Sequence, residues 1–306
     1  MTYDAIIVGG GPAALSSALY MGRYKRKTAV ITDSFGGLAG VAGEVENYPG
    51  FARIDGFELI KNMVEQIKNL EDIDIEENQK VDSIVRFNNL FKVAAGDKEY
   101  HSKGIIICAG MQPRKLGIKG EDALIGKGLS YCATCDGPFS KNKNAVVVGG
   151  GRSATESAID LAKIAQKVTI INIGEALSGE QITLDKLEEG DNITIVNNAE
   201  TKDFALDSGF IKAVKYKDKK SGKVKEIPAQ IVFVEIGQIP NSKPFEKLVK
   251  INKKKEIIID HKTNKTSEPG VYASGDITDI TFKQIVIAAG EGAKAAMSLN
   301  RYLESE

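Results

Sequence analysis

Histidine and cysteine are both scarce in this chain of 306 residues, which holds two histidines and three cysteines. An odd number of cysteines does not make a framework of structural disulfides. A structural zinc site usually takes four cysteine or histidine ligands, and the closely spaced Cys132 and Cys135 could begin such a set. Only Cys108, His101 and His261 remain to complete it, and none has the spacing of a ligand pair. We therefore expect no metal site.

Long apolar runs and an excess of charge of one sign are also lacking. No stretch approaches the roughly 20 apolar residues of a membrane span, and no charged leader with an apolar run precedes the first expected strand. Lys and Arg together number 41, as do Asp and Glu, so the formal net charge is zero. Nothing here indicates a nucleic-acid or membrane surface, and we expect a cytoplasmic protein that binds neither.

A long internal repeat dominates the sequence. Residues 5–31 align without a gap with residues 145–171, at an offset of 140. Each copy reads as an apolar strand, a Gly-rich turn, a helix and a second strand, and continuous apolar strands are typical of a parallel sheet covered on both faces. The repeat predicts an α/β protein with two Rossmann-like, three-layer nucleotide-binding domains.

The second domain is expected to be inserted into the first. Gly and Pro cluster near 110–114 and 237–241, where we expect hinges. The first domain would then comprise 1–112 and 242–306, and the second 113–241.

Further elements follow from the apolar pattern. Helical spacing in 57–70 predicts an amphipathic helix, and another helix is expected near 283–303. After the second repeat, the segments 193–196, 210–216 and 231–237 read as strands of a parallel sheet.

The first Gly-rich turn fits the pattern G-x-G-x-x-A. Gly9 permits the tight turn, Gly11 lets the backbone approach a pyrophosphate, and Ala14 lets helix and strand pack closely. Asp33 ends the second strand 24 residues after Gly9, where a carboxylate can accept hydrogen bonds from ribose. The residues expected to line this dinucleotide site are Gly9, Gly11, Pro12, Ala13, Ala14 and Asp33.

The second Gly-rich turn repeats the pattern with Gly149, Gly151 and Ala154. Ile173 stands where the first copy has Asp33, and no arginine lies between Val168 and Glu200. An unphosphorylated ribose usually meets a carboxylate and a 2′-phosphate needs a cation, yet neither is in the expected place. Two interpretations stay open: a nicotinamide nucleotide site, or a scaffold with weak or altered nucleotide affinity.

Cys132 and Cys135 form a C-x-x-C pair. Two thiols this close can form a short-range disulfide and cycle through thiol–disulfide exchange, and a purely structural disulfide is disfavoured in the cytoplasm. Asp136 follows directly and could donate or accept a proton during exchange, although a plain turn residue is the alternative. Cys108 ends an apolar strand and is interpreted as a small buried residue.

Two such repeats with C-A-T-C-D just before the second resemble the low-molecular-weight thioredoxin reductases, which are FAD-dependent, over nearly the whole chain. Residues 46–50 are similar to the family's E-N-x-P-G, and 270–276 to its C-terminal FAD motif, whose Asp binds the ribityl chain. Residues 35–38 are similar to its G-G-Q stretch, with Leu38 in place of Gln. The resemblance assigns to FAD, besides the first turn, Gly36, Gly37, Leu38, Asn47, Val81, Gly110, Gly275, Asp276, Gln284 and Ile285.

The resemblance also implies a mechanism. Cys135 would face the flavin, Cys132 would attack the disulfide of a thioredoxin-like protein, and Asp136 would be the acid. The high-molecular-weight relatives do not fit, because residues 34–50 hold no cysteine and no histidine follows His261.

The electron donor stays open. The NADPH-using members show H-R-R-x-x-x-R where this chain has residues 172–178 without any arginine, so NADPH, NADH, reduced ferredoxin and a reduced deazaflavin are all candidates. A homodimer is expected. A flavin-dependent dithiol oxidase that uses oxygen and a non-enzymatic flavin redox sensor are the alternative functions.

Overall fold

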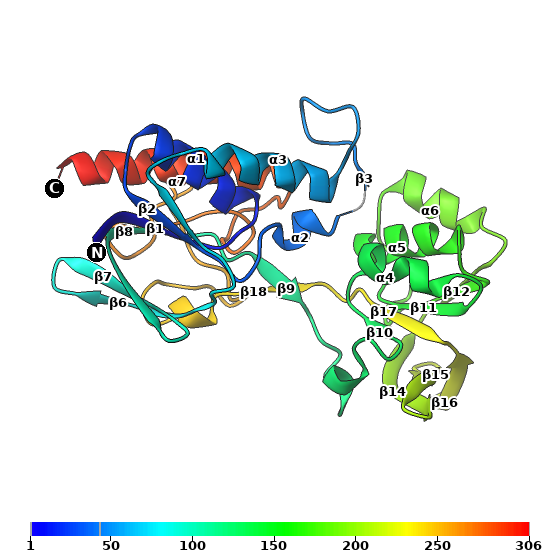
Figure 1. Ribbon diagram of the computed structural model, residues 1–306. Coiled ribbons are helices and arrows are strands. Elements are labelled where there is room, and N and C mark those ends of the chain that lie inside the picture. Colours follow the sequence, from blue (N-terminus) through cyan, green and yellow to red (C-terminus); the bar gives the residue numbers. More distant parts are fainter. Residues whose placement is uncertain (1, 43, 306) are drawn as a thin grey trace. The chain divides into compact units, whose positions relative to one another are not determined.

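A computed structural model describes residues 2–42 and 44–305 and divides the chain into two compact units. The first unit comprises Met1–Gln112 and Ile239–Glu306, and the second comprises Pro113–Gln238. The two connecting segments pair with each other as the short strands β9 (Met111–Pro113) and β18 (Gln238–Pro240) (Figure 1).

The first unit is built on a seven-stranded sheet. Its order is β5 (Ile73–Glu76), β2 (Thr28–Ile31), β1 (Thr2–Val8), β8 (Lys98–Ile107), β7 (Leu90–Ala95) and β6 (Val81–Phe87), and β19 (Val271–Ala273) also pairs with β8. The strands β5, β2, β1, β8 and β19 are parallel, whereas β6, β7 and β8 form an antiparallel meander. The carboxyl ends of β1, β2, β8 and β19 therefore meet at one edge, where ligands bind in such sheets.

Alternation along β1 gives this unit its three layers. Ala5 and Ile7 pack on the side of the helices α1 (Pro12–Arg23), α3 (Gly56–Lys68) and α7 (Ile285–Ser305). Ile6 and Val8 belong to the core on the opposite face, which they share with apolar residues of β6 and β7 and of the segments 245–259 and 277–280. The predicted amphipathic helix and closing helix are confirmed as α3 and α7, although Phe57, counted as apolar in the pattern, is 61% exposed.

The second unit repeats this plan. Its five strands β10 (Leu129–Ser130), β17 (Ile231–Val234), β11 (Asn144–Val148), β12 (Lys167–Ile171) and β13 (Ile193–Val196) are all parallel. The helices α4 (Ala133–Asp136), α5 (Arg152–Ala162) and α6 (Gln181–Glu188) belong to one side of this sheet. Two Rossmann-like α/β units are thus confirmed.

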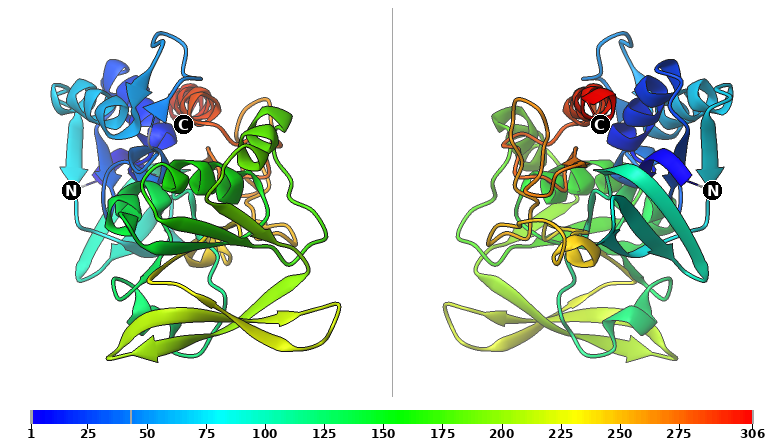
Figure 2. Two further views of the ribbon diagram at one scale, coloured as in Figure 1. Left: turned by 90° about the vertical axis from the view of Figure 1, so that its right-hand side faces the viewer. Right: turned by 90° about the vertical axis from the view of Figure 1, so that its left-hand side faces the viewer.

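A separate antiparallel sheet covers the other face of the second unit (Figure 2). It consists of β14 (Ala199–Asp207), β15 (Phe210–Asp218) and β16 (Val224–Pro228). The prediction that 210–216 joins a parallel sheet is therefore wrong. A tight turn with positive φ at Ser208 and Gly209 folds β15 back on β14, and apolar content alone does not distinguish a hairpin strand from a parallel one.

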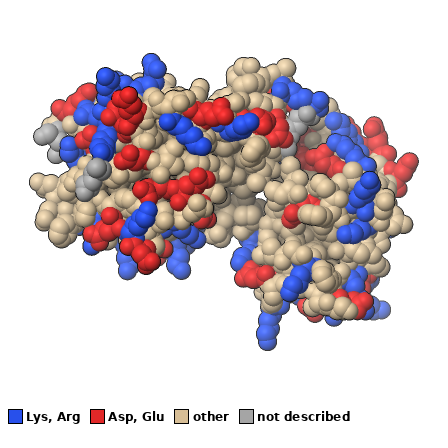
Figure 3. Space-filling model, viewed as in Figure 1, with Lys and Arg blue, Asp and Glu red and all other residues tan. Residues whose placement is uncertain are grey.

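The remaining elements are short: α2 (Gly37–Gly40), β3 (Glu44–Val45), β4 (Ile54–Asp55) and three 3₁₀ turns at Glu121–Leu124, Gly137–Ser140 and Lys243–Phe245. Lysine and arginine alternate with acidic residues over the visible surface of each unit (Figure 3). Within 2–42 and 44–305, no helix has the length and apolar character needed to cross a membrane.

Candidate active site

In the Gly-rich turn of the first unit, Gly9 and Gly11 have different surroundings, so glycine is needed at the two positions for different reasons. Gly9 has φ +123°, and a Cβ there would lie 2.3 Å from the Cys108 carbonyl oxygen, so the fold itself needs glycine. Gly11 has an ordinary φ of −84°, and a Cβ there would meet only the Gly36 oxygen, at 3.8 Å. The space beside Gly11, at the first turn of α1, is open to a ligand such as a pyrophosphate.

A buried carboxyl group lies near this turn, at the carboxyl end of β19. Asp276 follows β19 after Gly275, whose φ is +77°. Its Oδ1 is buried and accepts no hydrogen bond from the described part of the chain. Burial raises the pKa of Asp276, and Lys283 opposes that shift only in part. An acceptor held in this way fits the hydroxyl groups of a polyol chain such as ribityl.

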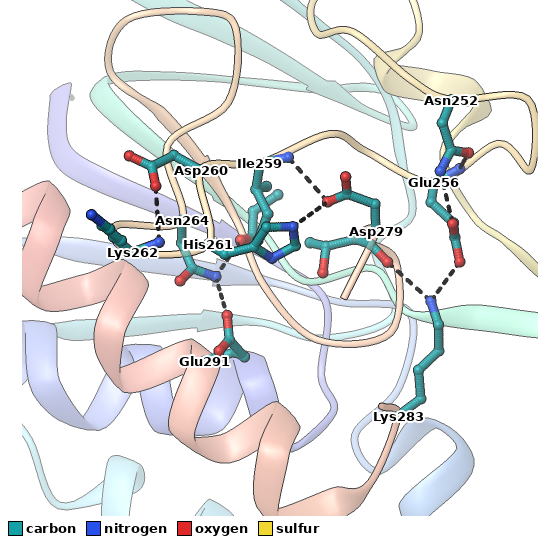
Figure 4. Close-up of polar contacts among 12 residues, drawn as sticks. Asn252, Glu256, Ile259, Asp260, His261, Lys262, Asn264, Asp279, Lys283 and Glu291 are labelled. Carbon is teal, nitrogen blue, oxygen red and sulfur yellow. Dashed lines mark hydrogen bonds and ion pairs between the residues drawn. The ribbon is translucent and has the colours of Figure 1, made fainter. Parts of the chain in front are cut away.

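Lys283 holds the loop that carries Asp276. Its Nζ donates to the carbonyl oxygens of Asp276 (2.6 Å) and Thr278 (2.9 Å) and lies 2.9 Å from the Glu256 carboxylate (Figure 4). The sequence reasoning missed both Lys283 and Glu256, because nothing in their spacing shows that they meet. Glu256 is further held by Asn252, whose Nδ2 donates to it at 2.8 Å.

We predict that Lys283→Met lowers the free energy of unfolding at pH 7 by about 2 kcal/mol, because the Glu256 carboxylate and two carbonyl oxygens lose the ammonium group that donates to them. Burial raises the pKa of Glu256, but the hydrogen bonds from Asn252 and Lys283 outweigh it, so the net pKa is lowered. A depressed carboxyl pKa stabilises the fold above the unfolded-state value and loses that contribution as the pH falls through the folded-state value. The difference between wild type and variant should therefore shrink as the pH is lowered into that acidic range.

Denaturant unfolding at several pH values measures this difference. Lys247→Met, which removes an exposed lysine from the same unit, serves as the matched control. A Lys283→Met protein as stable as this control at pH 7 would contradict the stabilising role of Lys283 in this loop.

The other residues assigned to FAD lie in the same unit with varied surroundings. Asn47 donates from Nδ2 to Gln284 Oε1 at 3.2 Å, so the structure brings these two distant segments together, and Ile285 begins α7. Gly36 (φ +110°) and Gly37 (φ +52°) begin the turn of α2 that includes Leu38.

Three further residues assigned to FAD are an exposed aspartate, a glycine with positive φ and a buried valine. Asp33 is exposed just after β2, in keeping with a ribose contact. Gly110 (φ +59°) accepts a backbone hydrogen bond from Asn241 at 3.0 Å. Val81 is only 5% exposed and packs in the hydrophobic core, so its side chain contributes packing at the start of β6.

The second unit carries the cysteine pair. Cys132 and Cys135 are joined in a disulfide at the start of α4, and Cys135 N donates to Cys132 Sγ at 3.1 Å. Cys135 is exposed and Cys132 is half-buried. The pair therefore spans the first turn of α4, with Cys132 as its N-cap and Cys135 as the exposed member.

Ser130 fixes the acidic residue beside the pair. Its hydroxyl donates to Asp136 Oδ2 at 2.6 Å and accepts the Cys132 backbone N–H at 3.0 Å. Sequence reasoning missed Ser130, which ends β10 two residues before Cys132. Asp136 is thus held next to the disulfide by more than the turn it belongs to.

The second Gly-rich turn has the skeleton of the first but different neighbours. Gly149 has φ +148°, and a Cβ on Gly151 would meet nothing within 4 Å. Arg152, at the first turn of α5, lies 2.7 Å from Glu156 and 3.0 Å from Glu180. Ile173 is 57% exposed at the position that matches Asp33. A nucleotide could approach this turn, but no carboxylate of the described residues stands at the position that matches Asp33.

We predict that Ile173→Asp lowers the KM for NADH about tenfold, because it places a carboxylate where the first repeat has Asp33. The same charge should raise the KM for NADPH by repelling a 2′-phosphate. Anaerobic flavin reduction at increasing nucleotide concentration measures both values. The control is Ile182→Asp, at another exposed isoleucine of this unit. Equal KM values for the two variants would contradict the expectation that residue 173 lies beside the ribose.

Cys108 is a buried free thiol, as predicted. Burial raises its pKa to about 11, and the hydroxyls of Ser274 and Ser17 lie 3.2 and 3.9 Å from its sulfur. Among the described residues no group of three or more His, Cys, Asp or Glu is placed to hold a metal ion.

Fold and site together give two Rossmann-like units with Gly-rich turns, the second of which carries a disulfide-bonded cysteine pair. The model of the pyridine nucleotide-disulphide oxidoreductases matches residues 3–292. The thioredoxin reductase of Lactococcus lactis in its FR conformation has a TM-score of 0.93 at 33% identity, covering 99% of this chain and 100% of its own. The thioredoxin reductase of T. acidophilum has a TM-score of 0.90 at 37% identity, covering 99% of both chains.

A curated relative shows the same kinship. This relative, an alkyl hydroperoxide reductase component of Staphylococcus epidermidis, is 35% identical over 302 residues, which is 98% of this chain but 59% of the relative's length. The chain belongs to the FAD-dependent pyridine nucleotide-disulphide oxidoreductases, and the resemblance to low-molecular-weight thioredoxin reductases is confirmed.

Proposed function

We propose that this protein is a cytoplasmic FAD-dependent reductase of the disulfide in a thioredoxin-like protein. The observation that carries the proposal is the Cys132–Cys135 disulfide at the start of α4, in a chain similar over its whole length to thioredoxin reductases. When bound, FAD supplies the two-electron chemistry, and the protein supplies binding, orientation and proton transfer.

The first unit would hold FAD. The open space beside Gly11 would receive the pyrophosphate, Asp33 the ribose, and the unpartnered Oδ1 of Asp276 the ribityl hydroxyls. Asn47 and Gln284, already bonded to each other, would lie beside the ring system. These groups match the successive parts of one extended dinucleotide.

The second unit would pass the electrons on. Reduction breaks the Cys132–Cys135 bond and adds two electrons and two protons. Cys132 would then attack the partner's disulfide, and Cys135 would resolve the mixed disulfide, which transfers both electrons. The hydrogen bond from Cys135 N–H to Cys132 Sγ favours a thiolate on Cys132. Asp136, held by Ser130, would accept or donate the proton exchanged by the cysteine pair.

The FAD residues and the cysteines belong to different units. One short dithiol cannot contact the flavin and a bulky partner disulfide at the same time. We therefore propose that the units move during the cycle, with the hinge at the connecting strands β9 and β18.

NADPH is proposed to be a poor donor, because neither an arginine nor a carboxylate follows β12 where a nucleotide ribose would lie. The experiment mixes the flavin-loaded protein anaerobically with NADPH, NADH, reduced ferredoxin and a reduced deazaflavin in turn, and then adds an oxidised thioredoxin. We expect slow bleaching with micromolar NADPH, and reoxidation of the flavin by thioredoxin. Fast bleaching by micromolar NADPH would contradict the donor proposal, and rapid oxygen uptake with a small dithiol but no reaction with thioredoxin would contradict the reductase.

A further inference from the structure

Glu235 lies directly after β17, at the carboxyl edge of the second parallel sheet. This strand runs between β10, which leads to Cys132, and β11, which leads to the second Gly-rich turn. The Glu235 N–H donates to the Val148 oxygen at 2.7 Å, and its own carbonyl oxygen lies 2.2 Å from where a Cβ on Gly149 would stand. The backbone at Glu235 is thus part of the scaffold of the turn.

The side chain of Glu235 reaches towards the cysteine pair. Its carboxylate accepts a hydrogen bond from the Ser157 hydroxyl at 3.3 Å and another from the backbone N–H of Ala133, the residue after Cys132. Burial raises the pKa of Glu235 to about 7, in spite of these two hydrogen bonds, and Glu156 raises it further. This carboxyl group therefore gains or loses its proton near neutral pH.

The internal repeat provides a comparison within the same molecule. In the first unit Cys108 occupies the matching place: its N–H donates to the Val8 oxygen at 2.8 Å, and its carbonyl oxygen lies 2.3 Å from a Cβ on Gly9. Ser17, at an offset of 140 from Ser157, has its hydroxyl 3.9 Å from the Cys108 sulfur. The same scaffold thus accepts an uncharged side chain, so its packing does not explain a carboxylate in the unit that carries the disulfide.

We propose that Glu235 is a positioning residue that stores a proton for the Cys132–Cys135 pair, through its contact with the Ala133 N–H. The inference rests on the redox function proposed above for the pair. When a dithiol reduces the disulfide and is itself oxidised, two electrons and two protons enter the pair and its surroundings. One proton stays on Cys135, Cys132 becomes a thiolate, and the second proton resides on Glu235. When a partner disulfide takes the two electrons, both protons leave with them.

The charges around Glu235 set the sign of the effect. Glu156 faces it from α5, where Arg152 partly neutralises that charge. Cys135 and Asp136 lie on α4, and Cys132 is the N-cap of that helix. A negative charge on Glu235 disfavours a thiolate on Cys132, and a thiolate in turn favours protonation of Glu235. Removing that charge should stabilise the reduced pair at alkaline pH.

The test equilibrates the full-length, flavin-loaded protein with dithiothreitol redox buffers from pH 6 to 8.5 and measures the reduced fraction of the pair by alkylation. In wild type, the plot of midpoint potential against pH should steepen above about pH 7, where reduction takes up the extra proton. Glu235→Gln should give a plot without this bend and, at pH 8, an equilibrium about tenfold more in favour of the dithiol, or about 30 mV.

Two further variants complete the test. Glu226→Gln, which neutralises an exposed glutamate on β16, should behave as wild type. Ser157→Ala keeps the Glu235 carboxylate but removes a hydrogen bond that lowers its pKa, so the bend should move to higher pH. This variant tests the role of Glu235 even if Glu235→Gln does not fold. Coincident plots for Glu235→Gln, Ser157→Ala and wild type would overturn the inference alone. A wild-type pair that does not react with dithiothreitol would overturn the proposed function and the inference with it.

Discussion

Cys135→Ser should retain its flavin and lose electron transfer to a thioredoxin-like protein by at least about 10³-fold, because a single remaining thiol cannot form or resolve the disulfide. FAD would be bound by the first unit, whereas this substitution lies on α4 of the second, so the absorbance of the flavin should be unchanged. The decisive measurement is the rate of thioredoxin reduction with chemically reduced flavin as the starting state. That starting state makes the result independent of the natural donor.

Cys108→Ser is the matched control, because it replaces the remaining cysteine with the same atom change in a buried place between two serine hydroxyls. It should transfer electrons at the wild-type rate. Cys132→Ser should fail like Cys135→Ser, but it would also lose any mixed disulfide with the partner, which Cys135→Ser should accumulate. Transfer by Cys135→Ser at more than a tenth of the wild-type rate would contradict the role of the pair.

The parts of the fold that the sequence predicts are those whose information is local. Continuous apolar strands, a Gly-rich turn and a helix follow one another within 5–31 and 145–171, so both βαβ units are predictable from one pattern and its repeat. The prediction for β15 is wrong about the kind of sheet, because the partner of this strand is set by a two-residue turn that outweighs its apolar content.

The missed site residues depend on tertiary contacts. Lys283 meets Glu256 from a segment 27 residues away, and Glu235 meets Ala133 across about a hundred residues. No spacing rule connects such pairs, whereas the C-x-x-C pair and the Gly-rich turns are each defined by a few consecutive positions. A site is thus predictable from sequence where its residues lie within one loop. Where tertiary packing brings distant residues together, the structure is needed to identify them.

The two turns also show that a repeated skeleton does not imply a repeated function. A Cβ on Gly10 would clash with the Ser34 oxygen at 2.3 Å, and one on Gly150 with Asn172 Oδ1 at 2.1 Å, so both loops are equally tight. Asp33 and Ile173 then follow at the same offset with opposite chemistry. The two turns thus share their tight backbone and differ in the side chain that follows the second strand, where we expect ligand preference to be set.

Gly11→Ala and Gly9→Ala should therefore fail for different reasons. An Ala at position 11 meets only one oxygen, 3.8 Å away, at an ordinary φ, so the apoprotein should unfold at the wild-type temperature. The added methyl would occupy the space proposed for the pyrophosphate, and we expect FAD affinity to fall by at least about 100-fold, or about 2.7 kcal/mol. An Ala at position 9 would stand 2.3 Å from the Cys108 oxygen at φ +123°, which should destabilise the apoprotein itself by about 3 kcal/mol.

Thermal unfolding of the apoproteins and titration with FAD separate the two effects. Gly151→Ala makes the same change in the second turn, where nothing lies within 4 Å of the new Cβ, and should leave both the unfolding temperature and the flavin content unchanged. If Gly11→Ala were purified with a full complement of flavin, the space beside this residue would not be the pyrophosphate site. Because Gly9 and Gly11 are two residues apart in one turn, an equal loss of stability in both variants would likewise show that the turn serves the fold alone.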